Sequence, residues 1–233
     1  IISLGGEFCF HTRVTDIDLN SKTLKVVHNT KDTSEDTISA GAAVFAIGHS
    51  ARDTFEMLYK HQIPMRAKSF AVGVRIEHPQ TLIDHSQYGR DRGNDLPAAA
   101  YKLTENLDNG RGVYTFCMCP GGFVVASSSE EDTVVTNGMS EHARDAENAN
   151  SALVVSVDGK DFGSDVLAGI AFQRKLEREA FCLGGRDYRA PAQSVQSFLE
   201  KSTPDLSKPL TTPSFSCGVK EANLREAFPE QIN

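Results

Sequence analysis

The sequence predicts an α+β fold, in which a β-meander and a strand–helix unit are followed by a mostly antiparallel β-rich part with two or three helices. The antiparallel part is indicated by segments such as 69–79, which alternate apolar and polar residues as half-buried strands do. A helix is indicated at 166–182, where apolar residues recur at helical spacing. The apolar run 44–47, followed by a glycine and a helical pattern, is typical of a strand buried on both faces of an α/β sheet.

Length, composition and charge exclude several classes of protein. The 233 residues, 39% hydrophobic and 24% charged, suit a globular protein of one or two domains. A net charge of −7 with scattered Lys and Arg argues against binding nucleic acid through a basic face. No apolar run approaches the roughly 18 residues that a membrane span needs, so no membrane partner is expected. The five cysteines are not densely spaced and no signal peptide is recognised, so we expect a cytoplasmic protein.

The first 66 residues predict a small meander before the buried run. Residues 8–17 and 24–28 have strand patterns and flank a turn signal at 20–22. We place the first domain boundary at residue 66. Because the chain starts at Ile1 rather than Met, we expect it to be a central fragment of a larger protein.

The strand predicted at 44–47 ends at Gly48, where the missing Cβ lets the backbone pass close to another group. Ser50 is expected to cap a helix over about 51–59, with Asp53 in the capping-box position. In open α/β sheets, ligands bind beyond the carboxyl ends of strands, beside helix N-termini. An ordinary βα turn is the alternative, and the pattern alone favours it.

The second part of the chain predicts further strands and helices. Strands are expected at 98–103, 112–118, 123–127, 134–136 and 151–157, turns at 109–110 and 137–138, and a last helix that opens at 188–193 and runs to about 200. Arg75 and Glu77 share the polar face of strand 69–79 and are interpreted as a solvated charge pair. Asn148 and Asn150 are interpreted as turn formers before a strand.

The most unusual local composition is Phe-Cys-Met-Cys-Pro-Gly-Gly-Phe at 116–123. Cys117 and Cys119 would face one side of a strand, in a spacing too tight for an easy disulfide. A zinc site would need two further ligands, and no second paired Cys or His cluster is found, so no metal is expected and buried free thiols are the simpler interpretation. Gly121 and Gly122 allow a close approach of the backbone, which is useful beside a flat ring system.

Several of these segments resemble known flavoproteins. Val-Phe-Ala-Ile-Gly at 44–48 resembles the second dinucleotide-contact segment of two-dinucleotide-binding-domain flavoproteins, although Ile47 replaces the usual Thr and its hydroxyl contact is lost. The extension Gly-His-Ser-Ala-Arg-Asp at 48–53 resembles a bacterial family of uncharacterised FAD-dependent dehydrogenases, also described as NAD(FAD)-utilising. Further matches to that family are FAVGVRIEHPQ at 70–80, TFCMCPGGFVV at 115–125, TNGMS at 136–140, an NAN-ALVV pattern at 148–155 and a GI-FQR--E--AF--GG pattern at 169–185.

This resemblance implies a domain organisation and a cofactor. Residues 1–66 would be the remnant of a Rossmann-type FAD-binding domain, 67–205 an inserted substrate or cap domain, and 206–233 a connection back towards the FAD-binding domain. The chain contains no Gly-x-Gly-x-x-Gly, so we expect this fragment alone to bind FAD weakly or not at all. The implied cofactor-binding residues are Ala46, Ile47, Gly48, Ser50, Arg52, Gly121 and Gly122. NAD(P)H is a candidate electron donor.

The resemblance also provides candidates for catalysis, although it identifies no reacting atom. They are Cys117, Cys119, Arg174 and Glu177. Arg174 together with Arg178 would suit a carboxylate or phosphate substrate, whereas a solvated helix surface is the default interpretation of both.

Two functions therefore compete at this point. The first is the central part of a flavin-dependent oxidoreductase that acts on a small substrate, with this fragment inactive alone. The second is a non-catalytic cap domain that binds a ligand or partner without flavin. A hydrolase is disfavoured because the nucleophile-elbow pattern Gly-x-Ser-x-Gly is absent from the sequence.

Overall fold

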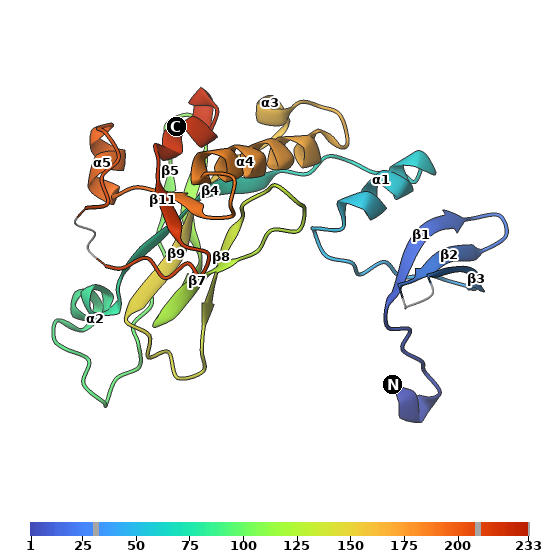
Figure 1. Ribbon diagram of the computed structural model, residues 1–233, viewed down its shortest axis with the longest axis horizontal. Coiled ribbons are helices and arrows are strands. Elements are labelled where there is room, and N and C mark those ends of the chain that lie inside the picture. Colours follow the sequence, from blue (N-terminus) through green and yellow to red (C-terminus); the bar gives the residue numbers. More distant parts are fainter. Residues whose placement is uncertain (30–32, 208–210, 233) are drawn as a thin grey trace. The chain divides into compact units, whose positions relative to one another are not determined.

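The protein has an α+β fold, as predicted, with mostly antiparallel sheets (Figure 1). The structure is a computed structural model that describes residues 1–29, 33–207 and 211–232. It divides into two compact units, Ile1–Arg66 and Ala67–Asn233. No helix in the described part of the chain is long and apolar enough to cross a membrane.

The first unit is built on an antiparallel meander in the order β1-β2-β3. Its elements are the 3₁₀ helix η1 (Ile2–Leu4), strands β1 (Thr12–Asp18), β2 (Thr23–His28) and β3 (Ser34–Ser39), and helix α1 (Arg52–Lys60). The predicted strand 8–17 thus begins only at Thr12. His61, just after α1, places Nε2 2.5 Å from the Oδ1 of Asp16 on β1, and this hydrogen bond is the main reason that the pKa of Asp16 is lowered to about 2.

The predicted buried strand at 44–47 is wrong. This segment has no regular structure, and Val44 is 92% and Ile47 41% exposed. A strand buried on both faces needs neighbouring strands, and in the described residues the meander strands pair only with one another. The predicted Ser50 cap is also wrong, because the N-cap residue of α1 is Ala51 and no side chain caps the helix. The contact of Ser50 is made by its backbone instead: its carbonyl accepts a hydrogen bond from the N–H of Arg52 at 2.9 Å.

The second unit contains a four-stranded antiparallel sheet in the order β4-β9-β6-β5. A β7-β8 hairpin and a short parallel β10-β11 pair complete its strands. The strands are β4 (Phe70–Pro79), β5 (Thr104–Asn106), β6 (Gly112–Cys119), β7 (Gly122–Ala126), β8 (Thr136–Ser140), β9 (Asn148–Val157), β10 (Ala190–Ala192) and β11 (Val219–Glu221). The strands predicted at 69–79 and 112–118 are confirmed as β4 and β6. Both pair with β9, β4 along its whole length and β6 with a register shift between Phe116 and Cys119.

The helices of the second unit are α2 (Gln80–Tyr88), α3 (Gly159–Phe162), α4 (Ala168–Gly184) and α5 (Val195–Glu200), with 3₁₀ helices η2 (Leu224–Ala227) and η3 (Glu230–Ile232). The predicted helix at 166–182 is confirmed as α4, which ends at Gly185 in the left-handed conformation. A buried cluster packs α4 against β7 and β10. Its members are Val124, Val134, Phe181, Ala190 and Phe215. Phe215 brings the C-terminal part of the chain into this core.

Several predicted elements of the second unit are wrong. Residues 98–103 form no strand, and β5 begins only at Thr104. The strand expected at 134–136 and the turn expected at 137–138 are replaced by β8, which contains Asn137 and Gly138. The predicted turn at Asn148 and Asn150 is instead the start of β9. The last helix starts at Val195, because 190–192 pairs as β10 and Ser194 caps the helix by accepting from the N–H of Ser197.

Candidate functional site

The candidate site is centred on residues 117–122, which comprise the end of β6, the turn at 120–121 and the start of β7, and which include both predicted cysteines and both predicted glycines. β6 is irregular there, because its register with β9 shifts between Phe116 and Cys119. Cys117 lies in this bulge with φ 47, a left-handed conformation that costs a non-glycine residue of the order of 1 kcal/mol. Its side chain is exposed, whereas Cys119 is buried and donates from Sγ to the carbonyl oxygen of Cys117 at 3.3 Å.

Arg75 of β4 lies at the centre of a polar cluster beneath this bulge. Its Nη1 donates to Oδ1 of Asn150 at 2.6 Å and to the carbonyl of Cys117 at 3.3 Å, and its Nη2 donates to Oδ1 of Asn137 at 3.3 Å. Asn150 is fully buried. A Cβ on Gly138 would collide with Asn150 Oδ1 and Arg75 Nη1, so β8 packs against the cluster only because residue 138 is glycine. The interpretation of Arg75 as a solvated charge is therefore wrong.

Glu77, two residues further along β4, is partly buried and hydrogen-bonded within the protein. Its Oε1 accepts from Nδ2 of Asn148 at 2.8 Å, and both carboxylate oxygens accept from the N–H of Ser214 at 3.1 Å. Asn148 also donates to the carbonyl of Thr212 at 2.9 Å. Glu77 and Asn148 thus fix the segment around 211–215 to the sheet. The sequence analysis missed this structural role, because it interpreted Glu77 as a solvated charge and Asn148 as a turn former.

The two cysteines should differ in reactivity. Burial is the main cause that raises the pKa of the Cys119 thiol, so its reactive thiolate forms at a higher pH than that of an ordinary cysteine. We expect iodoacetamide to modify Cys117 about tenfold or more faster than Cys119 in the native protein near neutral pH. Tandem mass spectrometry of the tryptic peptide that follows Arg111 separates the two sites. In urea the difference should largely disappear, and equal native rates would contradict the described burial.

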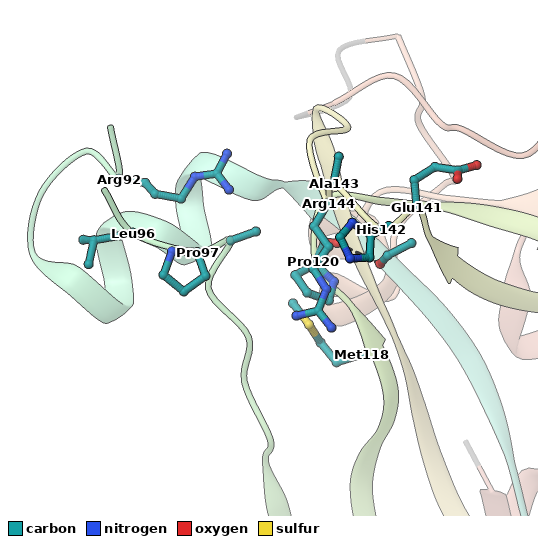
Figure 2. A pocket seen from close by; sticks show the side chains of 11 residues that line it. Arg92, Leu96, Pro97, Met118, Pro120, Glu141, His142, Ala143 and Arg144 are labelled. Carbon is teal, nitrogen blue, oxygen red and sulfur yellow. Dashed lines mark hydrogen bonds between the residues drawn. The ribbon is translucent and has the colours of Figure 1, made fainter. Parts of the chain in front are cut away.

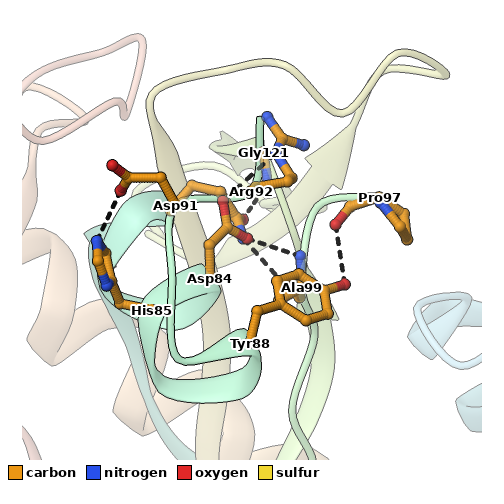
Figure 3. Close-up of polar contacts among 9 residues, drawn as sticks. Asp84, His85, Tyr88, Asp91, Arg92, Pro97, Ala99 and Gly121 are labelled. Carbon is orange, nitrogen blue, oxygen red and sulfur yellow. Dashed lines mark hydrogen bonds and ion pairs between the residues drawn. The ribbon is translucent and has the colours of Figure 1, made fainter. Parts of the chain in front are cut away.

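A buried hydrogen-bond network attaches helix α2 to this turn (Figure 3). Gln80 accepts at Oε1 from the N–H of Gly121 at 2.7 Å, and its Nε2 donates to Oδ1 of Asp84 at 2.7 Å and to the carbonyl of Ala99 at 3.0 Å. Asp84 also accepts from the N–H of Ala99 at 2.9 Å, and its Oδ2 lies 3.4 Å from Nε of Arg92. One glutamine and one aspartate therefore fix three separate segments of the chain.

The glycines of the turn make room for the protein's own backbone. A Cβ on Gly121, which has φ 48, would collide with the backbone of Arg144, and a Cβ on Gly122 would collide with the carbonyl of Met139. The hydroxyl of Ser140 donates to the carbonyl of Pro120 at 2.7 Å. The turn is thus fixed from both sides.

A cleft of about 570 Å³ opens beside the turn, a volume within the usual range for small-molecule sites (Figure 2). Figure 2 shows Arg92, Leu96 and Pro97 on one wall, and Met118, Pro120, His142 and Arg144 on the other. The remaining lining residues are Ala98, Ser140, Glu141 and Ala143. No predicted site residue lines this cleft, but Met118 and Pro120 alternate with Cys117, Cys119 and Gly121 along the same segment.

Comparison with known proteins identifies the family. Residues 69–233 match the family described as FAD-dependent protein, C-terminal domain-like. The chain belongs to this FAD-dependent family. A protein of Clostridium beijerinckii described as uncharacterized is 48% identical over 234 residues, which cover 98% of the present chain and 43% of the relative. The chain thus spans less than half the length of that relative.

The residues of this FAD-dependent family member that were predicted to bind the cofactor lie in both units. In the first unit, Ala46, Ile47, Gly48 and Ser50 are exposed, whereas Arg52 is buried. Gly48 has φ 74, and an added Cβ would meet no atom within 4 Å, so the backbone there is open. The space over Gly121 and Gly122 is filled by protein backbone.

Arg174 and Glu177 of the predicted catalytic set lie on α4. Nε of Arg174 donates to both carboxylate oxygens of Glu130, at 2.9 and 2.8 Å, and its Nη2 donates to Oε1 at 2.7 Å. Glu177 accepts from the N–H of Val134 through its backbone carbonyl at 3.0 Å. The ion pair largely neutralises Arg174, which weakens the argument that it receives an anionic substrate. In the described part of the chain, no three His, Cys, Asp or Glu side chains are grouped to hold a metal ion.

The sequence interpretation missed the residues that build the cleft. Gln80 and Asp84 are four residues apart and so share one face of α2. This spacing could have predicted a polar face on the helix. Nothing local indicates that this face is buried, because its partners Ala99 and Gly121 come from distant segments. No pattern in the sequence singled out Arg144 as a site residue.

Proposed function

We propose that this chain is the central part of a longer FAD-dependent oxidoreductase that acts on a small substrate. The observation that carries the proposal is the family match over 69–233. The 43% coverage of the Clostridium beijerinckii relative supports a longer parent protein. When bound, FAD would supply the redox step by accepting or donating electrons.

The residues of this chain would bind and orient rather than carry electrons. The open backbone at Gly48 would approach the dinucleotide, while exposed Ala46, Ile47 and Ser50 would be covered by it or by the rest of the parent protein. In the second unit, the turn at 117–122 would present the Cys117 thiol and the cleft to the substrate. NAD(P)H as the electron donor is part of the proposal.

The test uses the purified full-length protein. We expect a visible flavin absorption band, release of FAD on denaturation, and bleaching by dithionite; NADH and NADPH are then tried separately as reductants. Gly48→Val should lower the bound FAD about tenfold or more, because the new side chain fills the open approach. Gly5→Val, at another glycine of the first unit with a left-handed φ (82) whose added Cβ meets no atom within 4 Å, should retain FAD, because it adds the same backbone strain away from that approach.

A full-length protein that is colourless and takes up no added FAD would contradict the proposal and favour a ligand-binding cap domain without flavin. Equal FAD content in the Gly48 and Gly5 variants would retain the oxidoreductase but remove the role of Gly48.

A further inference from the structure

We propose that the cleft beside the β6–β7 turn is an oxyanion-binding site, in which Arg144, Arg92 and His142 receive a phosphate or carboxylate group. The cleft is more basic than the chain as a whole. Two arginines and one histidine line it against one carboxylate, Glu141, although the chain carries a net charge of −7. In Figure 2 the Glu141 carboxylate points away from the other cleft side chains.

Arg144 provides the strongest observation. It is exposed, and within the described residues no hydrogen bond or ion pair engages its guanidinium. Its φ is 52, a left-handed conformation that is unfavourable for a residue with a side chain. Strained residues gather at functional sites, where the surrounding structure over-determines them. The backbone of Arg144 is thus fixed at the cleft, and its guanidinium is available to a ligand.

The surroundings of Arg144 explain how this conformation is maintained. Its N–H donates to the carbonyl of Glu141 at 3.1 Å, and its backbone packs against Gly121, where a Cβ would not fit. The N–H of Gly121 in turn donates a hydrogen bond to Oε1 of Gln80 at 2.7 Å. This sequence of contacts positions the Arg144 backbone before any ligand binds, which lowers the entropic cost of binding.

Arg92 is positioned from the opposite wall by the same network. Its Nε lies 3.4 Å from Asp84, whose side chain is almost fully buried and is bonded to Gln80 and Ala99. Figure 2 places Arg92 and Arg144 on opposite walls of the cleft. Guanidinium groups bind carboxylate and phosphate through paired N–H donors, so two arginines across a cleft suit an oxyanion. Both Arg92 and Arg174 have a carboxylate neighbour. Arg174 makes hydrogen bonds of 2.7–2.9 Å to Glu130, whereas Arg92 approaches Asp84 only to 3.4 Å.

The test measures binding of inorganic phosphate and of succinate to the full-length protein by isothermal titration calorimetry, with ionic strength matched by chloride. We expect one molecule of at least one oxyanion to bind per chain. Arg144→Gln should weaken it about tenfold or more, as expected for loss of a charge-assisted hydrogen bond. Ala143→Glu, at an exposed position of the cleft, should do the same by adding a negative charge. Arg186→Gln, at an exposed arginine that has a similar left-handed φ of 63 but lies outside the cleft, is the control and should bind as the wild type does.

Binding of phosphate alone assigns a phosphate group, binding of succinate alone assigns a carboxylate, and binding of both assigns a general oxyanion site. Failure of both to bind the wild type would overturn the inference, as would unchanged affinity in both Arg144→Gln and Ala143→Glu. The FAD content of each variant is measured in parallel. Loss of oxyanion binding with unchanged FAD separates this site from the proposed flavin function, on which it does not depend.

Discussion

Replacing Gly121 with alanine should destabilise the second unit by about 2–4 kcal/mol, because two penalties add. A left-handed φ of 48 costs alanine roughly 1 kcal/mol relative to glycine. The new Cβ would also collide with the backbone of Arg144, and overpacking of this kind costs about 1–3 kcal/mol. The free energy of unfolding, measured by urea denaturation of the full-length protein, gives the difference directly.

Gly110 provides a matched control for this substitution. It has φ 79 in the turn between β5 and β6, and an added Cβ would meet no atom within 4 Å. Gly110→Ala should therefore cost only the backbone penalty of about 1 kcal/mol. If both substitutions destabilise equally, the close approach of Arg144 to Gly121 does not exist in the protein.

Gln80→Leu should destabilise the protein by about 3 kcal/mol, because leucine has a similar volume but no hydrogen-bonding groups. The buried N–H of Gly121 and the carbonyl of Ala99 would each lose a partner, and each such loss costs about 1–3 kcal/mol. Asp84 would retain its bond from the N–H of Ala99 and its ion pair with Arg92. Urea denaturation again measures the change.

Gln196→Leu on α5 is the control, since Gln196 is exposed and donates to Glu200 on its own helix at 3.0 Å. Its effect should stay within about 0.5 kcal/mol. A Gln80 variant that is no less stable than the Gln196 variant would show that the network in Figure 3 contributes little to stability. Gln80→Leu should also weaken oxyanion binding, because it removes the bond that fixes Gly121 against Arg144.

Elements with a strong local period were predicted well, and elements that depend on distant partners were not. β4 pairs with β9 along its whole length, and α4 packs Phe181 into the buried cluster, so pattern and packing agree. Asn137-Gly138 has the chemistry of a turn but lies in β8, because only glycine fits beside Arg75 and Asn150. Asn148 and Asn150 likewise have turn chemistry, but they lie in β9, where Asn148 Nδ2 donates to Glu77 and Asn150 Oδ1 accepts from Arg75, both on β4.

The apolar run at 44–47 is the opposite case, a strand that was predicted but does not form. Its composition indicates a buried strand, but composition alone does not provide the neighbouring strands that bury it, and Val44 is exposed in the described structure. The cysteines and glycines of the β6–β7 turn were recognised from their unusual composition. The residues that fix this turn and line the cleft were missed, because each is ordinary in its own segment.

The sequence by itself determined the α+β class, the strands and helix with a strong period, and the resemblance to FAD-dependent proteins, since all of these depend on the identity and spacing of neighbouring residues. Only the tertiary structure decided that Gln80 is buried, that Gly121 packs against Arg144 and that Arg92 and Arg144 share a cleft. These features depend on contacts between segments far apart in the chain. Their energies come from desolvation and steric fit, which a local pattern does not encode.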